Sequence, residues 1–276
     1  MSDAGTAHGT VLFVLAHHDD EVFCAGHLLR ALRAGRRVRL LWATAGGLAP
    51  AARRCLEGER VGRLLRLAPG DGRDLRLRDQ QALRHLAAIA AAAEELLGSA
   101  HGAEAPLVYV PAYEGGHPDH DAVNLAVRLL RTRRPDAEAR EFPLYRRSAA
   151  GLSVQSPRPA AGTSAQSFEI LSLDPGALAL RRRLVRANAS QALPSLLPLL
   201  ALAWAQGRGR AEPSRPLPVH DYARPPHEGA LLYELYTRRR FAEFRAAALA
   251  ALADAAPAGA AEQGAGTPLA PRRPGV

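Results

Sequence analysis

The chain has 276 residues, of which 47% are hydrophobic and 23% are charged. This length suffices for a sizeable hydrophobic core, and the composition excludes a small disulfide scaffold, a collagen-like repeat and a long coiled coil. The formal net charge is +9, yet the sequence contains no lysine, and its arginines are scattered among many alanines. The positive charge therefore indicates a compositional bias, and we expect no nucleic-acid partner because no nucleic-acid-reading motif accompanies it.

Cysteine usage and hydropathy indicate a reduced compartment. Cys24 and Cys55 lack CxxC spacing, which favours free thiols in a cytoplasmic protein. The apolar run Val11–Ala16 is too short for the h-region of a signal peptide. The Leu-rich stretch Leu193–Trp204 contains two prolines and is shorter than the roughly 20 residues that cross a bilayer. We expect no membrane span, and the sequence leaves open whether the chain forms a homo-oligomer.

Apolar runs alternate with segments of helical periodicity from the first residues onward. Val11–Ala16 and Val38–Thr44 are typical of buried strands, and Glu21–Ala34 between them has the spacing of a helix. Further strands are expected at Leu107–Ala112 and Glu141–Tyr145, and further helices at Ala51–Leu67, Gln80–Leu97, His120–Arg133, Ala179–Asn188 and Leu231–Leu252. This order predicts an α/β fold with a doubly wound, mostly parallel sheet and helices on both faces. We expect one domain over residues 8–252 and a disordered, Ala/Gly/Pro-rich tail over 253–276.

Two polar loops follow two of these strands. His17–Glu21 follows the first strand, and His117–Asp121 follows Leu107–Ala112. Open α/β sheets bind ligands at this carboxyl edge, but no GxGxxG is present and the acidic residues disfavour a dinucleotide. Two histidines with several carboxylates suit a divalent metal, since a catalytic zinc site takes three such ligands and leaves a fourth position for water. Neither loop is specific alone, and together they indicate a metal site.

The two loops carry a family resemblance. Ala16–Glu21 reads AHHDDE and is similar to the AHPDDE signature of the PIG-L (LmbE-like) N-acetylglucosaminyl de-N-acetylase family, and His117–His120 reads HPDH, its second motif. The segments Pro111–Ala122 and Pro225–Gly229 resemble a bacterial branch of the same family. The resemblance extends over roughly Val11–Phe244. It implies a Rossmann-like fold and a zinc-dependent hydrolase of N-acyl, mostly N-acetyl, amino sugars.

The resemblance also implies roles for individual residues. By motif position, His17, Asp20 and His120 would bind one Zn²⁺ per chain, or another divalent ion. Asp19 would be the general base on a zinc-bound water that attacks the amide carbonyl, and His117 would stabilise or protonate the reacting centre. The sequence does not decide whether Asp19 or His117 protonates the leaving amine.

Four more residues are candidates for supporting roles. Asp119 and Asp121 could orient His117 or His120 through the far ring nitrogen. Arg54 could bind a substrate hydroxyl or phosphate, or be an ordinary surface arginine. Glu228 could bind sugar hydroxyls or close a turn.

The sequence departs from the family pattern at two places. His18 replaces the usual proline, which offers an extra imidazole as a spare ligand or substrate contact, although a loop residue is the simpler interpretation. The segment Thr44–Gly47 lacks the glutamate expected there. Both changes affect the expected substrate more than the metal. We therefore predict removal of an N-acetyl group from an amino-sugar-containing small molecule, with two alternatives: an amidase of a non-sugar amide, and a catalytically silent sugar-binding protein.

Overall fold

The structure is a computed structural model that describes residues 8–47, 49–98, 104–161, 163–164 and 166–255. Its strands are β1 (His8–His17), β2 (Arg36–Thr44), β3 (Gly72–Leu77), β4 (Leu107–Pro111), β5 (Glu138–Phe142), β6 (Tyr145–Ser148), β7 (Gly151–Val154), β8 (Glu169–Ser172) and β9 (Ala211–Pro216). Seven of them form one sheet in the order β3-β2-β1-β4-β5-β9-β8, and β6 pairs with β7 in a separate hairpin. Pairing is parallel from β3 to β5 and antiparallel at β9 and β8.

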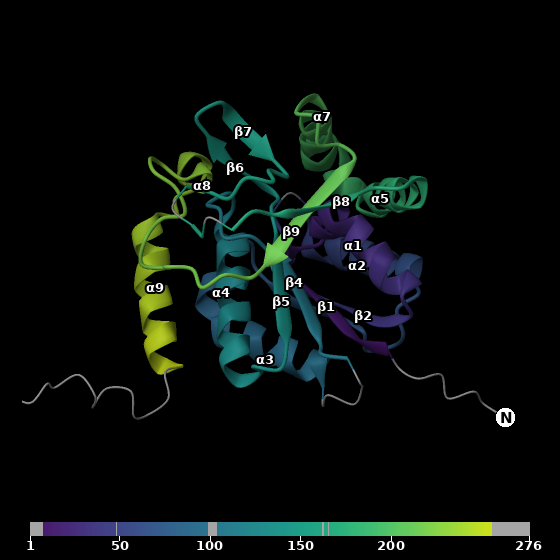
Figure 1. The fold of residues 1–276 in the computed structure, drawn as a ribbon, viewed down its shortest axis with the longest axis horizontal. Coiled ribbons are helices and arrows are strands. Elements are labelled where there is room, and N and C mark those ends of the chain that lie inside the picture. Colours follow the sequence, from purple (N-terminus) through teal and green to yellow (C-terminus); the bar gives the residue numbers. More distant parts are fainter. Residues whose placement is uncertain (1–7, 48, 99–103, 162, 165, 256–276) are drawn as a thin grey trace, which may run out of the picture.

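Helices cover both faces of the sheet (Figure 1). One face packs against α1 (Ala25–Arg33), α2 (Ala51–Leu65) and α5 (Pro175–Ala187), and the other against α3 (Leu86–Leu97), α4 (Pro118–Arg133) and α9 (Phe241–Asp254). The shorter helices are α6 (Ala189–Gln191), α7 (Leu197–Ala205) and α8 (Leu232–Tyr236).

Residues 11–16 of β1 are apolar without interruption because this part of the strand is buried on both faces. Side chains alternate between the faces of a strand, so Phe13 and Leu15 enter the core under α1 and α2, while Leu12 and Val14 enter the core under α3 and α4. All four are fully buried. The expected α/β fold with a mostly parallel sheet and helices on both faces is confirmed.

The strand order reverses between β1 and β4, because β2 and β3 lie on one side of this pair and β5 lies on the other. Such a reversal opens a crevice at the carboxyl ends of the two strands, where α/β folds bind their ligands. The loop after β1 begins with His18, and the loop after β4 leads to His117. The fold therefore brings the two polar loops to one place.

Several elements differ from the sequence prediction. The helix expected from Glu21 starts with a 3₁₀ turn at Asp20–Cys24, and the helix expected over Leu231–Leu252 is divided into α8 and α9. The strands β3, β6, β7, β8 and β9 were not expected. The sequences of β3 and β9 are rich in charged residues or proline, and β6, β7 and β8 are only four residues long. The tail expected over 253–276 lies largely outside the described residues, since α9 ends at Asp254. No helix in the described part of the chain is long and apolar enough to cross a membrane.

A buried histidine in α1 makes the stability of this core depend on pH. His27 is 2% exposed, and its Nε2 atom has no hydrogen-bond partner among the described residues. Its ring lies 4.9 Å from that of Tyr109. Burial, with the positive charges of Arg30 and Arg140, lowers the pKa of His27 to about 3.

This pKa predicts a specific pH dependence. An unfolded histidine titrates near pH 6.5, so between pH 6.5 and 3 the unfolded chain binds a proton that folded His27 excludes. The resulting stability is present above pH 6.5 and is lost as the pH falls. His27→Asn removes this pH dependence. The free energy of unfolding of the variant, minus that of the unchanged protein, should therefore rise by up to about 1.4 kcal/mol for each pH unit that the pH falls below 6.5. Urea unfolding between pH 5 and 8 measures it, and a constant difference would contradict the lowered pKa.

Candidate metal centre and active site

The carboxylate of Asp20 is the centre of the first loop. Its Oδ2 atom accepts hydrogen bonds from the backbone N–H groups of Ala16 and His17, each at 2.9 Å. Its Oδ1 atom lies 3.2 Å from His120 Nε2 and 3.8 Å from His17 Nδ1. These three side chains bring one ligand atom each to within 4.8 Å of one another. The three residues expected as metal ligands thus converge on one point.

The other ring nitrogen of His17 is also engaged. Nε2 lies 3.3 Å from Asp119 Oδ2 and 3.5 Å from Asp79 Oδ1. The Asp119 carboxylate is itself fixed by the backbone N–H groups of Gln80, at 2.7 Å, and Ala82, at 3.0 Å. A proton on Nε2 therefore donates to a carboxylate and leaves the Nδ1 lone pair for a metal, as is usual for metal-binding histidines.

The cluster favours a positive charge. Burial by itself lowers the pKa of His17, but the hydrogen bonds to Asp119, Asp20 and Asp79 raise this pKa well above its ordinary value. Burial raises the pKa of Asp20, but His120 and His17 outweigh it and hold the pKa well below its ordinary value. The surroundings of His17 and Asp20 thus favour a bound positive charge. Two imidazoles with one carboxylate are a donor set that suits Zn²⁺. The residues present therefore fit the metal that the resemblance implies.

Asp19, the expected general base, adopts a strained backbone conformation. Its φ is 117°, a region that residues other than glycine rarely occupy. Arg54 Nη2 lies 3.4 Å from its Oδ1 atom, and both residues line the cavity that contains His17. Burial raises the pKa of Asp19 to about 8, although Arg54 lowers it. The loop thus aims a carboxylate of raised basicity into the cavity beside the metal ligands.

Arg54 is a buried residue of α2, so the surface-arginine interpretation is wrong. The residue is 1% exposed. Its Nε donates to the carbonyl of Ala45 at 3.2 Å, and its Nη1 donates to Glu57 Oε2 at 2.9 Å. With these two partners fixing the guanidinium, Arg54 holds Asp19 in place, and a contact to substrate stays a prediction.

His117 is the residue that caps the N-terminus of α4. Its Nδ1 atom accepts the backbone N–H of Asp119 at 3.2 Å, so the ring proton is on Nε2. Nε2 lies 3.8 Å from Asp79 Oδ1. Burial and the neighbouring charge of His17 lower the pKa of His117 to about 3. The ring is neutral and presents one N–H to the cavity.

The chain immediately before His117 approaches the β6 strand closely. A Cβ atom on Gly116 would lie 1.9 Å from the backbone oxygen of Tyr145, so only glycine fits this position. Asp121 Oδ1 accepts the backbone N–H groups of Glu114, at 3.2 Å, and Gly115, at 3.1 Å. This carboxylate therefore fixes the loop and contacts no ring nitrogen, which corrects the role expected for it.

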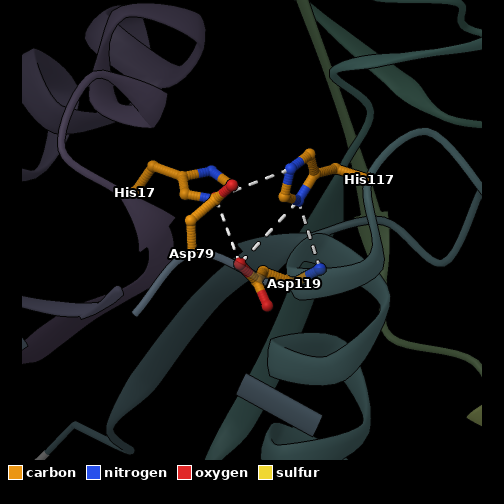
Figure 2. A group of neighbouring side chains, drawn as sticks. All are labelled: His17, Asp79, His117 and Asp119. Carbon is orange, nitrogen blue, oxygen red and sulfur yellow. Dashed lines mark hydrogen bonds and ion pairs between the residues drawn. The ribbon is translucent and has the colours of Figure 1, made fainter. Parts of the chain in front are cut away.

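The role expected for Asp119 also needs correction. Its carboxylate faces His17 at 3.3 Å and lies 4.0 Å from Nδ1 of His117, which the Asp119 backbone N–H already occupies. Figure 2 shows Asp119 between the rings of His17 and His117, with Asp79 close to both. The reason is the helical turn at the start of α4, which directs the Asp119 side chain toward β1.

Asp79 is a residue that sequence reasoning missed. It follows β3, whose polar sequence GRDLRL does not have the pattern of a buried strand. Once β3 is recognised, an aspartate two residues beyond its carboxyl end lies at the same edge as the other site residues. Asp79 lines the cavity, and the charge of His17 and their hydrogen bond outweigh burial and lower its pKa to about 2.

Two further candidates, His18 and Glu228, lie away from the metal ligands. His18 Nε2 is 3.0 Å from Asp74 Oδ2, and its ring stacks on Trp42 with centroids 4.7 Å apart. His18 is therefore a buried loop residue and no spare ligand. Glu228 is exposed and is not among the residues that line the cavity, so its contact to substrate stays a prediction.

Several of these side chains, among them His17, Asp19 and Asp20, line one cavity of about 560 Å³, a size typical of small-molecule sites. Its polar wall is formed by His17, Asp19, Asp20, Gly46, Gly47, Arg54, Asp79, Gln80, His117 and Gln191. The remaining lining residues are mostly apolar or aromatic: Phe23, Tyr145, Leu152, Pro194, Ser195, Pro198, Leu199, Leu232 and Tyr236.

The comparisons with known proteins agree with this arrangement. Residues 12–130 match the PIG-L family model, described as GlcNAc-PI de-N-acetylase. No curated protein matches the chain. The matched residues contain both the loop after β1 and the loop after β4.

Solved structures show the same fold at low sequence identity. A deacetylase–teicoplanin complex of teicoplanin biosynthesis has 18% identity and a TM-score of 0.56, covering 75% of this chain and 98% of that chain. The zinc-inhibited form of teicoplanin deacetylase Orf2 has 18% identity and a TM-score of 0.55, covering 75% and 97%. The chain thus shares its fold with these deacetylase structures, and the role of each site residue rests on the geometry of this chain.

The contacts of Asp119 predict a loss of metal affinity in Asp119→Asn. Both carboxylate oxygens accept backbone N–H groups while one also faces His17, and an amide has only one oxygen to replace them. Zinc affinity should fall about 10- to 100-fold, as measured by competition with a chelating dye. Asp71→Asn, at an equally buried carboxylate paired with Arg37 and Arg39, is the matched control. Equal zinc affinity in the Asp119 and Asp71 variants would contradict the conclusion that Asp119 holds His17 in position for the metal.

The φ of Asp19 predicts that the loop stores strain. Asp19→Gly should be more stable than Asp19→Ala by about 1 kcal/mol or more, because glycine adopts this φ without steric cost. Thermal and urea unfolding of the two variants measure the difference. If Asp19→Ala were the more stable of the two, the backbone of this loop would not be strained.

Proposed function

We propose that the chain is a zinc-dependent deacetylase that hydrolyses the N-acetyl group of an amino-sugar-containing small molecule. The observation that carries this proposal is the convergence of His17 Nδ1, Asp20 Oδ1 and His120 Nε2 beside the carboxylate of Asp19. The PIG-L match over residues 12–130 supports the same reaction class. The proposal includes one ion per chain.

His17, Asp20 and His120 would hold the ion. A zinc ion bound there supplies a Lewis acid for the amide carbonyl and makes water a better nucleophile at neutral pH. The remaining chemistry depends on side chains of this chain that face the cavity.

Asp19 is the base in this proposal. It lines the cavity beside two of the metal ligands, and Arg54 holds one of its oxygens at 3.4 Å. A carboxylate in this position can take a proton from the attacking water. A carboxyl group that has gained this proton can then return it to the leaving amine.

His117 is the hydrogen-bond donor for the oxyanion. Because its Nδ1 atom accepts a backbone N–H, its only ring proton is on Nε2, which faces the cavity. A fixed neutral donor stabilises charge that develops on the carbonyl oxygen without reorganising. This geometry favours Asp19 over His117 as the proton donor to the amine.

The polar wall supports an amino sugar as substrate. Asp79, Gln80 and Gln191 offer acceptors and donors within the same cavity as the metal ligands. Sugar hydroxyls both donate and accept hydrogen bonds, so such groups suit a sugar substrate. A catalytically silent binding protein would not require the strained Asp19 beside the metal ligands.

Metal analysis and acetate release test the proposal together. Purified protein should contain close to one zinc per chain and release acetate from N-acetylglucosaminides. Asp19→Asn should keep the zinc and lose about 100- to 10,000-fold in kcat, whereas His120→Ala should lose both. Zinc with full activity in Asp19→Asn would contradict the assignment of the base. Protein that acquires no zinc would contradict the metal centre.

A further inference from the structure

A second, smaller cavity adjoins the cavity that contains the metal ligands. It has a volume of about 220 Å³ and lies between the start of α4, the 3₁₀ turn Ala82–His85, and the helices α8 and α9. Among the described residues, only Gln80 lines both cavities. The deacetylation proposed above uses no group of this second cavity except Gln80.

The second cavity carries an excess of positive charge, because three arginines and one glutamate line it. Glu243 Oε2 accepts a hydrogen bond from Arg239 Nη1 at 3.0 Å. Arg84 is exposed and makes no ion pair or side-chain hydrogen bond with a described residue, and Arg240 donates only to backbone carbonyls. Two guanidinium groups without a carboxylate partner thus meet at one cavity, which favours an anionic ligand.

Most of the remaining wall is apolar and is formed by Leu83, Pro118, Phe244 and Ala247. An apolar cavity of roughly 150 Å³ binds benzene, so a single ring or a short branched chain fits here. Tyr233 is 1% exposed and also lines the cavity, and its hydroxyl has no hydrogen-bond partner among the described residues. Because buried hydroxyls ordinarily have a partner, this group is a donor still available to a ligand.

Arg239 connects the second cavity to the metal centre through Gln80. Its Nη2 atom donates to the carbonyl of Gln80 at 3.1 Å, and the backbone N–H of Gln80 donates to Asp119 Oδ2 at 2.7 Å. That oxygen lies 3.3 Å from Nε2 of His17. Gln80 has a φ of 61°, in the left-handed region that residues other than glycine seldom adopt. Contacts on both sides therefore hold Gln80 in a strained conformation.

We propose that the second cavity is an inhibitory effector site for a small organic carboxylate with an apolar body. The carboxylate group binds the guanidinium groups of Arg84, Arg239 and Arg240, whose paired N–H donors match its two oxygens. The apolar body lies against Leu83 and Phe244. A ligand with both parts matches the wall of this cavity, whereas an inorganic ion would leave the apolar part uncovered.

The ligand competes with the Gln80 carbonyl for Arg239. A carboxylate is a stronger acceptor than a peptide carbonyl, so the guanidinium moves toward the ligand and releases Gln80. The support that Gln80 gives to Asp119, and Asp119 to His17, then weakens, and metal affinity falls. By thermodynamic linkage, the bound metal lowers affinity for the ligand by the same factor. This coupling rests on the proposed function because it requires the metal centre, whereas the anion site does not.

Benzoate is the probe, with benzamide as its uncharged counterpart and acetate as a carboxylate without a ring. The full chain is titrated calorimetrically with each compound, with and without zinc. Benzoate should bind about tenfold more tightly than benzamide, which lacks the charge. It should also bind about tenfold more tightly than acetate, which lacks the apolar body.

One pair of variants locates the anion site. Arg84→Gln removes a charge from the cavity wall and should weaken benzoate binding about fivefold while the protein keeps its stability. Arg245→Gln is the matched control, because Arg245 is exposed on α9 and does not line the cavity. Its affinity for benzoate should equal that of the unchanged protein.

Zinc affinity, measured by competition with a chelating dye, reports the coupling. Saturating benzoate should lower zinc affinity about fivefold or more. Arg239→Ala removes the donor to the Gln80 carbonyl, so it should lower zinc affinity without any ligand and abolish the further effect of benzoate. Arg238→Ala is the control, because Arg238 is exposed and does not line the cavity.

Several results would overturn the proposal. Equal binding of benzoate and benzamide, or benzoate binding that Arg84→Gln leaves unchanged, would exclude the anion site. A zinc affinity that benzoate does not change would exclude the coupling. A zinc affinity that benzoate raises would place the carboxylate on the metal and would exclude the coupling as well. A protein that acquires no zinc but binds benzoate as expected would instead reject the proposed function and keep the anion site.

Discussion

The two oxygens of Asp20 serve different partners, and the site depends on this division. One oxygen is bound by the last backbone N–H groups of β1, so the carboxylate cannot rotate away from the end of the strand. The other oxygen is thereby directed toward His120, which reaches it from the first turn of α4. The reversal of strand order between β1 and β4 is what brings these two segments together. A short loop after a fully buried strand has little freedom, and this rigidity makes the metal position specific.

Support for the site extends outward from this point through fixed polar contacts. Asp119 holds His17, and the backbone after β3 holds Asp119. On the other side, Arg54 holds Asp19, and Glu57 holds Arg54. Glu57 in turn accepts the backbone N–H of Ser190 at 2.8 Å and its hydroxyl at 2.7 Å. Each charged group in this series of contacts has a charged or polar partner, which is the condition under which charge is tolerated in a protein interior.

The amino-acid sequence predicts the elements that are apolar and regular. β1 and β4 contain continuous apolar runs, β2 is mostly apolar, and α4 has a clear periodicity, so their positions follow from the pattern alone. The sequence does not predict β3 or β9, because arginine, aspartate and proline obscure a strand that the neighbouring strands hold in place. Asp79 was missed for the same reason, since its place at the carboxyl edge depends on β3.

The motifs locate the site residues but do not fix their contacts. The convergence of His17, Asp20 and His120 follows from two motifs on neighbouring strands. The partner of each carboxylate depends on side-chain direction at the start of α4, which is why Asp119 supports His17 and Asp121 supports the preceding loop. His18 points away from the metal ligands because it contacts Asp74 and Trp42, neither of which is near it in sequence. The apolar helix α7 was noticed only as too short for a membrane, because exposure cannot be read from composition.

The most direct test of the metal centre is anomalous X-ray diffraction at the zinc absorption edge from crystals of the zinc-loaded protein. The account predicts one strong peak about 2.0–2.3 Å from His17 Nδ1, Asp20 Oδ1 and His120 Nε2, with Asp119 remaining at Nε2 of His17. A peak bound instead by His17, Asp79, His117 and Asp119 would contradict it. In that site His17 would bind the metal through Nε2, the nitrogen that is assigned here to the Asp119 carboxylate.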